Sequence, residues 1–415
     1  RLVLAGPLNS PQQMNFSQPG VYTNFNVSNP ILESDAIQGT LISGVLNSLK
    51  AMLPMTSGLI VFGDRLAWLV NGGSAGVAIT PINFSGQPQA YNGCSNVPPI
   101  VSNFDILYVQ AKGSIVRDLS YNFYTNVFTG TDISVLSSHL FYGYTITEWA
   151  YCEEPFKLIW AIRDDGVMLS LTFLKEQELI GWTHHVTDGE FKSVASVTEA
   201  VAFGSVDALY MVVERTIGAT TVQFIERMAE RIFPNGAEDA RCVDSGLQYD
   251  STPATVFSGL DHLIGEVVTG LADGVSFGTK TVSATGTVTL SSAASKVTIG
   301  LAFTPQLQTL ALDLGEPTVQ SKMKKFSDIT VRVKETLGLT IGTDASSQVV
   351  MKDLVVGNVG AMTNELVTDL VTGDARQVVD PLWQTMGQYL IRQPNPLPAS
   401  ILGVIPGITV GDQNG

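Results

Sequence analysis

The chain has 415 residues, of which 23 are basic and 38 acidic, so that its formal net charge is −15. With 45% hydrophobic and only 15% charged residues, and with 18 Phe, 11 Tyr and 5 Trp, it is neither intrinsically disordered nor a coiled coil. A pI near 4.6 also argues against a protein that binds nucleic acid by neutralising its phosphates.

The length predicts two or three domains, at roughly 150 residues each. No apolar run reaches the ~18 residues that a membrane-spanning helix needs, and the opening segment is too short for a secretory signal. Because the chain starts at Arg1 rather than Met, we expect a fragment or processed product that lacks an N-terminal part. Cys94, Cys152 and Cys242 lack metal-ligand spacing, and their odd number favours a reducing compartment over a disulfide framework.

Residues 1–55 are predicted to form an N-terminal arm and one helix. Residues 1–30 are rich in Asn, Gln, Pro and Ser, which is typical of an extended arm or irregular strands. Ser34 can then cap a helix that ends at Lys50, before Pro54. The apolar residues at helical spacing are Ile37, Leu41, Ile42, Val45, Leu46 and Leu49.

From about Thr56 the hydrophobic period changes to two, which predicts a β-meander or propeller-like platform over residues 56–251. Gly and Asp residues at regular short intervals mark the turns between its strands. The expected strands are Gly58–Phe62 and Leu66–Val70 around Gly63-Asp64, then Phe156–Arg163, Val167–Lys175 and Leu179–Val186 with turns at Asp165-Gly166 and Asp188-Gly189, and Ala208–Glu214 and Thr220–Arg227 around Ile217-Gly218.

Two further β regions are expected. Residues 252–313 are rich in Thr, Val and Ser, which suits a small β-barrel or sandwich domain. Residues 314–415 predict a β-rich C-terminal region with strands near Ile329–Lys334 and Leu337–Ile341. Its Pro-rich closing segment, Arg392–Val410, is expected to return to the platform and cover an edge or pack across a neighbour. The fold class is therefore mainly β with few helices.

The sequence motifs give little support for a catalytic nucleophile or a metal site. Gly72–Gly76 spells G-x-S-x-G, but a nucleophile elbow needs a helix after it, and an extended segment follows here. His184 and His185 are adjacent on a predicted strand and so point to opposite faces, and the other histidines are His139 and His262. With no H-E-x-x-H, C-x-x-C, P-loop or dinucleotide motif, neither a metal nor a cofactor is expected.

Acidic pairs are the remaining catalytic candidates. A glycosidase needs carboxylates that face each other across a cleft, whereas neighbours on a strand or turn are usually solvated. The pairs are Glu153-Glu154 and Asp164-Asp165.

Aromatic residues around the central meander could line a sugar site, but aromatics on strands more often belong to the core. They are Trp149, Tyr151, Trp160 and Trp182. Formal glycosylation sequons begin at Asn15, Asn26 and Asn83, and we expect them to be chance matches. No catalytic, cofactor-binding or metal residue is therefore predicted.

A series of short motifs runs through the middle of the chain. They are Ser114–Tyr121 with Tyr124, Thr129–Phe141, Trp149–Tyr151, Leu158–Trp160, Arg163–Leu169, Trp182–His184, Asp207–Tyr210, Val243–Gly246, Ser258–Leu263 with Gly265, and Asp273-Gly274. In this order they resemble the tail nozzle (tail tubular or hub) proteins of short-tailed double-stranded DNA phages. The resemblance is dense over residues 105–310 and looser beyond, where Arg392–Pro398 is similar to the closing segment of the family.

The resemblance implies a structural virion protein rather than an enzyme. Six copies would form a ring at the distal end of the tail, dock to portal-adaptor proteins and contact tail fibres or a needle. The ring would enclose the channel through which genomic DNA leaves, without sequence-specific binding, after assembly in the host cytoplasm. Family members are usually longer at the N-terminus. A label borrowed from ubiquitin-activating enzymes is often given to the region matching 252–313, but Cys242 lies outside it and no ubiquitin chemistry is implied.

An acidic, Lys-poor channel wall would suit such a conduit, because it does not hold phosphates in place. Two alternatives remain open. One is a tail adaptor that binds fibres or host glycan without forming a conduit or a six-fold ring. The other is a tail-associated glycan hydrolase that uses an acidic pair and loses turnover when one carboxylate is removed.

Overall fold

The computed structural model confirms a mainly β chain with few helices. Within the described residues every strand pairing is antiparallel, and the helices are short 3₁₀ turns. These turns are η1 Val135–Leu140, η2 Lys175–Gln177, η3 Gly236–Asp239, η4 Asp261–Leu263 and η5 Lys352–Leu354. The structure describes residues 1–74, 76–125, 127–201, 204–217, 219–313, 315, 318–355, 369–379 and 382–411.

By their contacts the residues divide into two compact units. Unit 1 comprises Arg1–Glu214 with Gln223–Arg227, and unit 2 comprises Arg215–Val222 with Met228–Gly415. The boundary therefore falls within the strands β17 and β18. In the part of the chain that the structure describes, no helix is long and apolar enough to cross a membrane.

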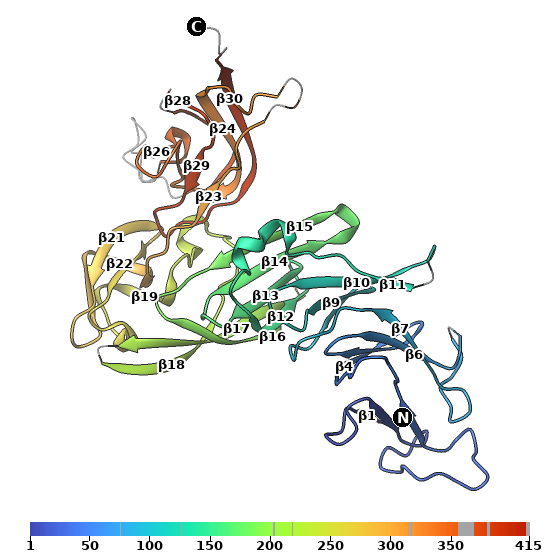
Figure 1. The fold of residues 1–415 in the computed structure, drawn as a ribbon. Coiled ribbons are helices and arrows are strands. Elements are labelled where there is room, and N and C mark those ends of the chain that lie inside the picture. The colour runs from blue at the N-terminus through green and yellow to red at the C-terminus, as the bar shows by residue number, and fades with distance from the viewer. Residues whose placement is uncertain are drawn as a thin grey trace. The chain divides into compact units, whose positions relative to one another are not determined.

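The first four sheets of unit 1 are each built from strands that are consecutive in the chain (Figure 1). Tight turns join many of them, as at Gly166, whose φ of 78° lies in the left-handed region that favours glycine. The strands are β1 Val3–Ala5, β2 Gln13–Phe16 and β3 Ile37–Thr40; β4 Leu49–Met55, β5 Gly58–Gly63, β6 Ala67–Asn71 and β7 Ser85–Ala90; β8 Ile100–Ser102, β9 Asp105–Val109, β10 Val116–Asn122 and β11 Val127–Thr129; β12 Ile146–Cys152, β13 Leu158–Arg163, β14 Met168–Leu174 and β15 Leu179–His185; and, in a fifth sheet, β16 Glu190–Val201, β17 Gly204–Ile217 and β18 Thr220–Arg227.

The predicted hairpin and meander are confirmed. β5 pairs with β6 around the turn at Gly63-Asp64, and β13, β14 and β15 form the expected three strands between residues 158 and 185. β17 and β18 are neighbours in their sheet, as the last hairpin requires, although Gly218 of its turn lies outside the described residues.

Each of the first three sheets shares a hydrophobic core with the next one along the chain. Successive residues of β5 point to opposite faces, so Val61 packs with the sheet β1–β3 while Ile60 and Phe62 pack with the sheet β8–β11. That sheet in turn places Ile106 on one side and Leu107 on the other, toward β12–β15. Each fully buried aliphatic side chain contributes about 1.5–3 kcal/mol to stability.

Unit 2 contains three further sheets. The first has the order β19-β22-β20-β21, the second β23-β29-β25-β26, and the third places β24 between β27 and β30, with β28 at one end of β24. Within unit 2 the Pro-rich closing segment thus forms a strand along β24. The strands are β19 Asp244–Phe257, β20 Val267–Ala272, β21 Val275–Thr281, β22 Val288–Leu301, β23 Gln306–Gln308, β24 Lys324–Thr336, β25 Thr340–Gly342, β26 Val349–Val350, β27 Val371–Val378, β28 Trp383–Gln384, β29 Leu390–Arg392 and β30 Ile401–Val410.

The prediction of a helix from Ser34 to Lys50 is wrong. This segment contains β3, an irregular loop and the start of β4. Its apolar residues form no single buried stripe, because Ile37 is buried while Ile42 and Leu46 are 81% and 73% exposed. An amphipathic helix gains most of its stability by packing one apolar face, and this segment has no such face to pack.

Gly39 shows why strand pairing prevails in this segment. A methyl group at this position would lie 2.4 Å from Cζ of Phe84, so the ring lies directly against the glycine backbone. Gly39 pairs with Met14 across β2 and β3, and this register buries Ile37 with Met14 and Phe16 in one core. Glycine also disfavours a helix interior by about 1 kcal/mol relative to alanine.

Replacing Gly39 by Ala distinguishes the strand from the helix. The added methyl group must displace the Phe84 ring, and overpacking of this kind lowers the unfolding free energy by about 1–3 kcal/mol. The control is Gly44→Ala, since a methyl group there meets no atom within 4 Å and we expect a change below about 0.5 kcal/mol. Urea denaturation gives the free energy of unfolding of the wild type and of both variants. A higher free energy of unfolding in both variants would instead support a helix.

Candidate assembly surface

The sheet β1–β2–β3 turns one face to the core of unit 1 and the other away from it. Met14, Phe16 and Ile37 point inward, to the core that this sheet shares with β4–β7. Leu4 pairs with Asn15, and Asn15 pairs with Gln38, so a row of alternate residues crosses all three strands on the opposite face. Leu4 and Gln38 are exposed and Asn15 is half-buried, and we call this the outer face.

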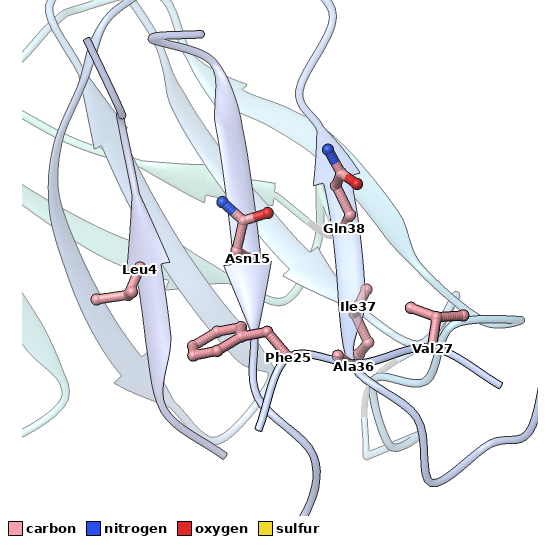
Figure 2. Close-up of a pocket in the computed structure, with 7 residues that line it drawn as sticks. All are labelled: Leu4, Asn15, Phe25, Val27, Ala36, Ile37 and Gln38. Atoms are coloured by element: carbon pink, nitrogen blue, oxygen red, sulfur yellow. The ribbon is translucent and has the colours of Figure 1, made fainter. Parts of the chain in front are cut away.

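An open hollow of about 260 Å³ lies on the outer face. Figure 2 shows Leu4, Asn15 and Gln38 on three neighbouring strands, with the ring of Phe25 and the side chain of Val27 supplied by the segment between β2 and β3. The lining residues are Leu4, Asn15, Phe25, Val27, Ala36, Ile37 and Gln38. None of them is charged, so the hollow suits an uncharged group that is mainly apolar.

The segment that supplies Phe25 and Val27 is held in shape by the buried side chain of Asp35. Its carboxylate accepts hydrogen bonds from the backbone N–H of Leu32 at 2.8 Å and from the N–H and hydroxyl of Ser28 at 2.9 and 2.8 Å. These donors, the Leu32 N–H foremost, hold the pKa of Asp35 below its usual range. The wall of the hollow is therefore organised before anything binds.

Arg1 fixes the same segment from the other side. Its guanidinium donates to the carbonyl oxygens of Ser17 at 2.8 Å, Asp35 at 2.6 Å and Glu33 at 3.0 Å. These three bonds tie the Arg1 side chain to the end of β2 and to the segment before β3.

The two amides of the hollow retain donors for a ligand. Oδ1 of Asn15 accepts a hydrogen bond from Nε2 of Gln13 at 2.9 Å, so the Nδ2 group of Asn15 remains available as a donor. Across the described residues neither Nδ2 of Asn15 nor the amide of Gln38 makes a hydrogen bond. The hollow therefore combines an apolar wall with two neutral hydrogen-bonding groups.

The surroundings of the outer face are poor in charge. Residues 1–104 carry three basic and three acidic residues, whereas the remaining 20 basic and 35 acidic residues lie in 105–415. Large apolar side chains are nonetheless exposed here, and twelve of them lie in the first 46 residues. They are Leu2, Leu4, Leu8, Val21, Tyr22, Phe25, Val27, Ile31, Leu32, Ile42, Val45 and Leu46. An exposed apolar region of this kind is typical of a protein–protein contact.

The aromatic residues of the central meander belong to the core, which confirms the simpler reading of them. Trp149 and Trp160 are buried, and Trp182 packs against the core between β8–β11 and β12–β15. The indole N–H of Trp149 donates to the carbonyl oxygen of Pro98 at 2.6 Å, and that of Trp182 to Ile133 at 2.9 Å. Tyr151 is half-buried and packs against the same core as Trp182.

The acidic pairs form no facing pair across a cleft. Asp165 is paired with the guanidinium of Arg163, which holds the pKa of Asp165 below its usual range. Asp164 accepts hydrogen bonds from the N–H and hydroxyl of Thr145 at 3.1 and 2.9 Å. Glu153 and Glu154 are exposed neighbours at the end of β12.

The other catalytic candidates are dispersed. Among the described residues no three His, Cys, Asp or Glu side chains gather as a metal site would require. His184 and His185 follow each other on β15, and Nε2 of His185 lies 2.8 Å from the hydroxyl of Ser170. His262 contacts the carbonyl oxygen of Ser245 at 3.0 Å, and His139 lies exposed on η1.

The cysteines and the glycine-rich motif also show no activated group. All three cysteines are free thiols, and burial raises the pKa of Cys94 to about 12 and that of Cys242 to about 11. Gly72–Gly76 follows the end of β6 in a loop, with Ala75 outside the described residues, and no helix starts there. The elbow arrangement is therefore absent around the described residues of this motif.

Comparison with known proteins identifies no family. No protein-family model and no curated protein matches the chain. A crystal structure of a protein from Lactobacillus plantarum is 10% identical and covers 68% of this chain and 82% of its own, with a TM-score of 0.25. A likeness this weak supports no conclusion about fold or function.

Replacing Asp35 by Asn tests whether its carboxylate organises the wall of the hollow. We expect faster hydrogen exchange at the Ser28 and Leu32 amides at pH 7, because a neutral amide accepts these bonds more weakly. Since the folded-state pKa is lowered, the contribution of Asp35 to stability is present above its unfolded value of about 3.9 and is lost as pH falls through the lower folded value.

An acid titration followed by circular dichroism completes this test. The wild-type chain should lose more stability between pH 5 and pH 3 than the Asp35→Asn variant does. Asp188→Asn, at an exposed turn outside this segment, is the matched control and should leave the Ser28 and Leu32 amides unchanged. Equal exchange in wild type and Asp35→Asn would contradict the role given to this carboxylate.

Proposed function

We propose that this chain is a structural protein of a short phage tail, a nozzle or hub subunit that forms a ring at the distal end. In this role it assembles with copies of itself, with portal-adaptor proteins and with tail fibres or a needle. The ring surrounds the channel through which genomic DNA passes into the host. The proposal combines the ordered motifs between residues 105 and 310 with the surface of the folded chain.

The observation that carries the proposal is the amount of large apolar surface left uncovered on a well-packed chain. Besides the outer face, Tyr142 is 88%, Leu136 90% and Tyr124 96% exposed. Single exposed apolar residues are ordinary, and the concentration of twelve of them in residues 1–46 supports a contact surface in this part of the chain. A subunit that is covered by neighbours on assembly explains why such groups are tolerated.

The placement of the polar residues supports an assembly role over a hydrolytic one. Asp164 and Asp165 are engaged by Thr145 and Arg163, and the meander tryptophans are used in the core. The same residues that would serve a glycan hydrolase thus stabilise the β platform. An adaptor without a conduit uses similar contact surfaces, and it differs from a nozzle in forming no closed ring.

The acidic balance suits a conduit for DNA. Residues 105–415 carry the entire net charge of −15, and a wall of that sign repels phosphates instead of holding them. DNA then moves past without the counterion-release affinity that retains it on basic proteins.

The test is native mass spectrometry with negative-stain microscopy of the purified chain, alone and mixed with its neighbouring tail proteins. We expect a closed ring of six subunits with a central hole in at least one of the two samples. A monomer in both samples would remove the nozzle and favour the adaptor or the hydrolase. A glycan-cleavage assay with the wild type and Asp164→Asn would then separate those two.

A further inference from the structure

We infer that the outer face of β1–β2–β3 is where one copy of this chain contacts a second copy. The inference rests on the proposed function, and it names the partner of the surface described above. It commits to a second copy of this chain because of how charge is distributed along the sequence.

Two copies of an acidic protein repel each other, and this repulsion opposes a close contact least where charge is sparse. The region 1–104 has no net charge, whereas 105–415 carries −15. Like charges brought together at an interface oppose binding, and buried unpaired charges are more unfavourable still. A contact between copies is therefore least opposed through the N-terminal quarter of the chain.

Three of the six charged side chains of this quarter make hydrogen bonds within the protein. Arg1 and Asp35 hold the segment between β2 and β3, as described above, and Asp64 accepts a hydrogen bond from the Ser48 N–H at 2.9 Å. Glu33, Lys50 and Arg65 then remain as the other charged residues up to residue 104. A basic partner would be drawn instead to the acidic remainder of the chain.

The hollow fits what a second copy offers. Its lining is uncharged, and the exposed aliphatic side chains of Leu8, Ile42 and Leu46, all from the same N-terminal region, are 73% to 96% exposed. An aliphatic side chain of one copy can enter the hollow of the other, while Asn15 and Gln38 donate to backbone carbonyl groups beside it. Because Asp35 already organises the segment between β2 and β3, this segment needs little further ordering when a second copy binds.

The effect of salt on subunit association distinguishes this apolar contact from one held by ion pairs. Salt screens the repulsion between the acidic parts of two copies, whereas the apolar contact itself is not weakened by screening. Association should therefore strengthen between 50 and 500 mM NaCl. An interface held by ion pairs would respond in the opposite direction.

The experiment measures subunit association of the full chain by sedimentation velocity and native mass spectrometry, in the sample that gives the ring. Gln38→Glu changes one exposed side chain to a charged group of the same shape, and we expect it to raise the concentration for half-assembly at least tenfold. Leu4→Glu should abolish assembly at 10 µM. The control Leu310→Glu changes an equally apolar, 88% exposed side chain in unit 2 and should assemble as the wild type does.

The outcomes separate this inference from the proposed function. If the wild type and both outer-face variants form the same ring equally well, the outer face is not the contact, and the proposed function stands. If Leu310→Glu is as defective as Leu4→Glu, the contact is not specific to the outer face and the inference is wrong. If the wild type stays monomeric at every salt concentration, with and without its neighbours, both are wrong.

Discussion

Burial of both faces of a β-sheet is the constraint on which the rest of unit 1 depends. Because successive side chains of β5 alternate between two cores, the sheet β4–β7 needs a covering sheet on each side. The sheets β1–β3 and β8–β11 supply these covers, and β8–β11 is covered in turn by β12–β15. The sheet β1–β3 contributes its other face to this series of cores, and its outer face carries Leu4, Asn15 and Gln38.

The sequence predicts those parts of the fold that are specified locally. The predicted bounds of β13, β14 and β15 agree with the structure to within about two residues, because Asp165-Gly166 marks the turn and the apolar runs around it are short. The sequence predicts a helix from Ser34 to Lys50, and this prediction is wrong because the apolar spacing there resembles that of a helix. The ring of Phe84 against Gly39, a contact between residues far apart in sequence, decides that segment in favour of a strand.

The candidate surface depends on information that spacing alone does not contain. β2 has only four residues, too few for its alternation to be recognised, and the row from Leu4 through Asn15 to Gln38 exists only once the register of three strands is set. The role of Asp35 likewise requires the bend that brings Ser28 and Leu32 to its carboxylate. The scarcity of charge before residue 105 was readable in the sequence, and it is the signal that could have located this surface.

The consecutive order of strands within the first four sheets has a consequence for how the protein is made. Each of these sheets pairs strands that lie close in sequence, so none has to wait for a distant segment before its hydrogen bonds form. Ribosomes release the N-terminal residues first, so the local pairings of these sheets allow them to form in the order of synthesis. The core that β1–β3 and β4–β7 share needs no residue beyond 104, so it can form while the ribosome is still translating the acidic remainder, whereas the other face of β4–β7 is covered only once β8–β11 follows.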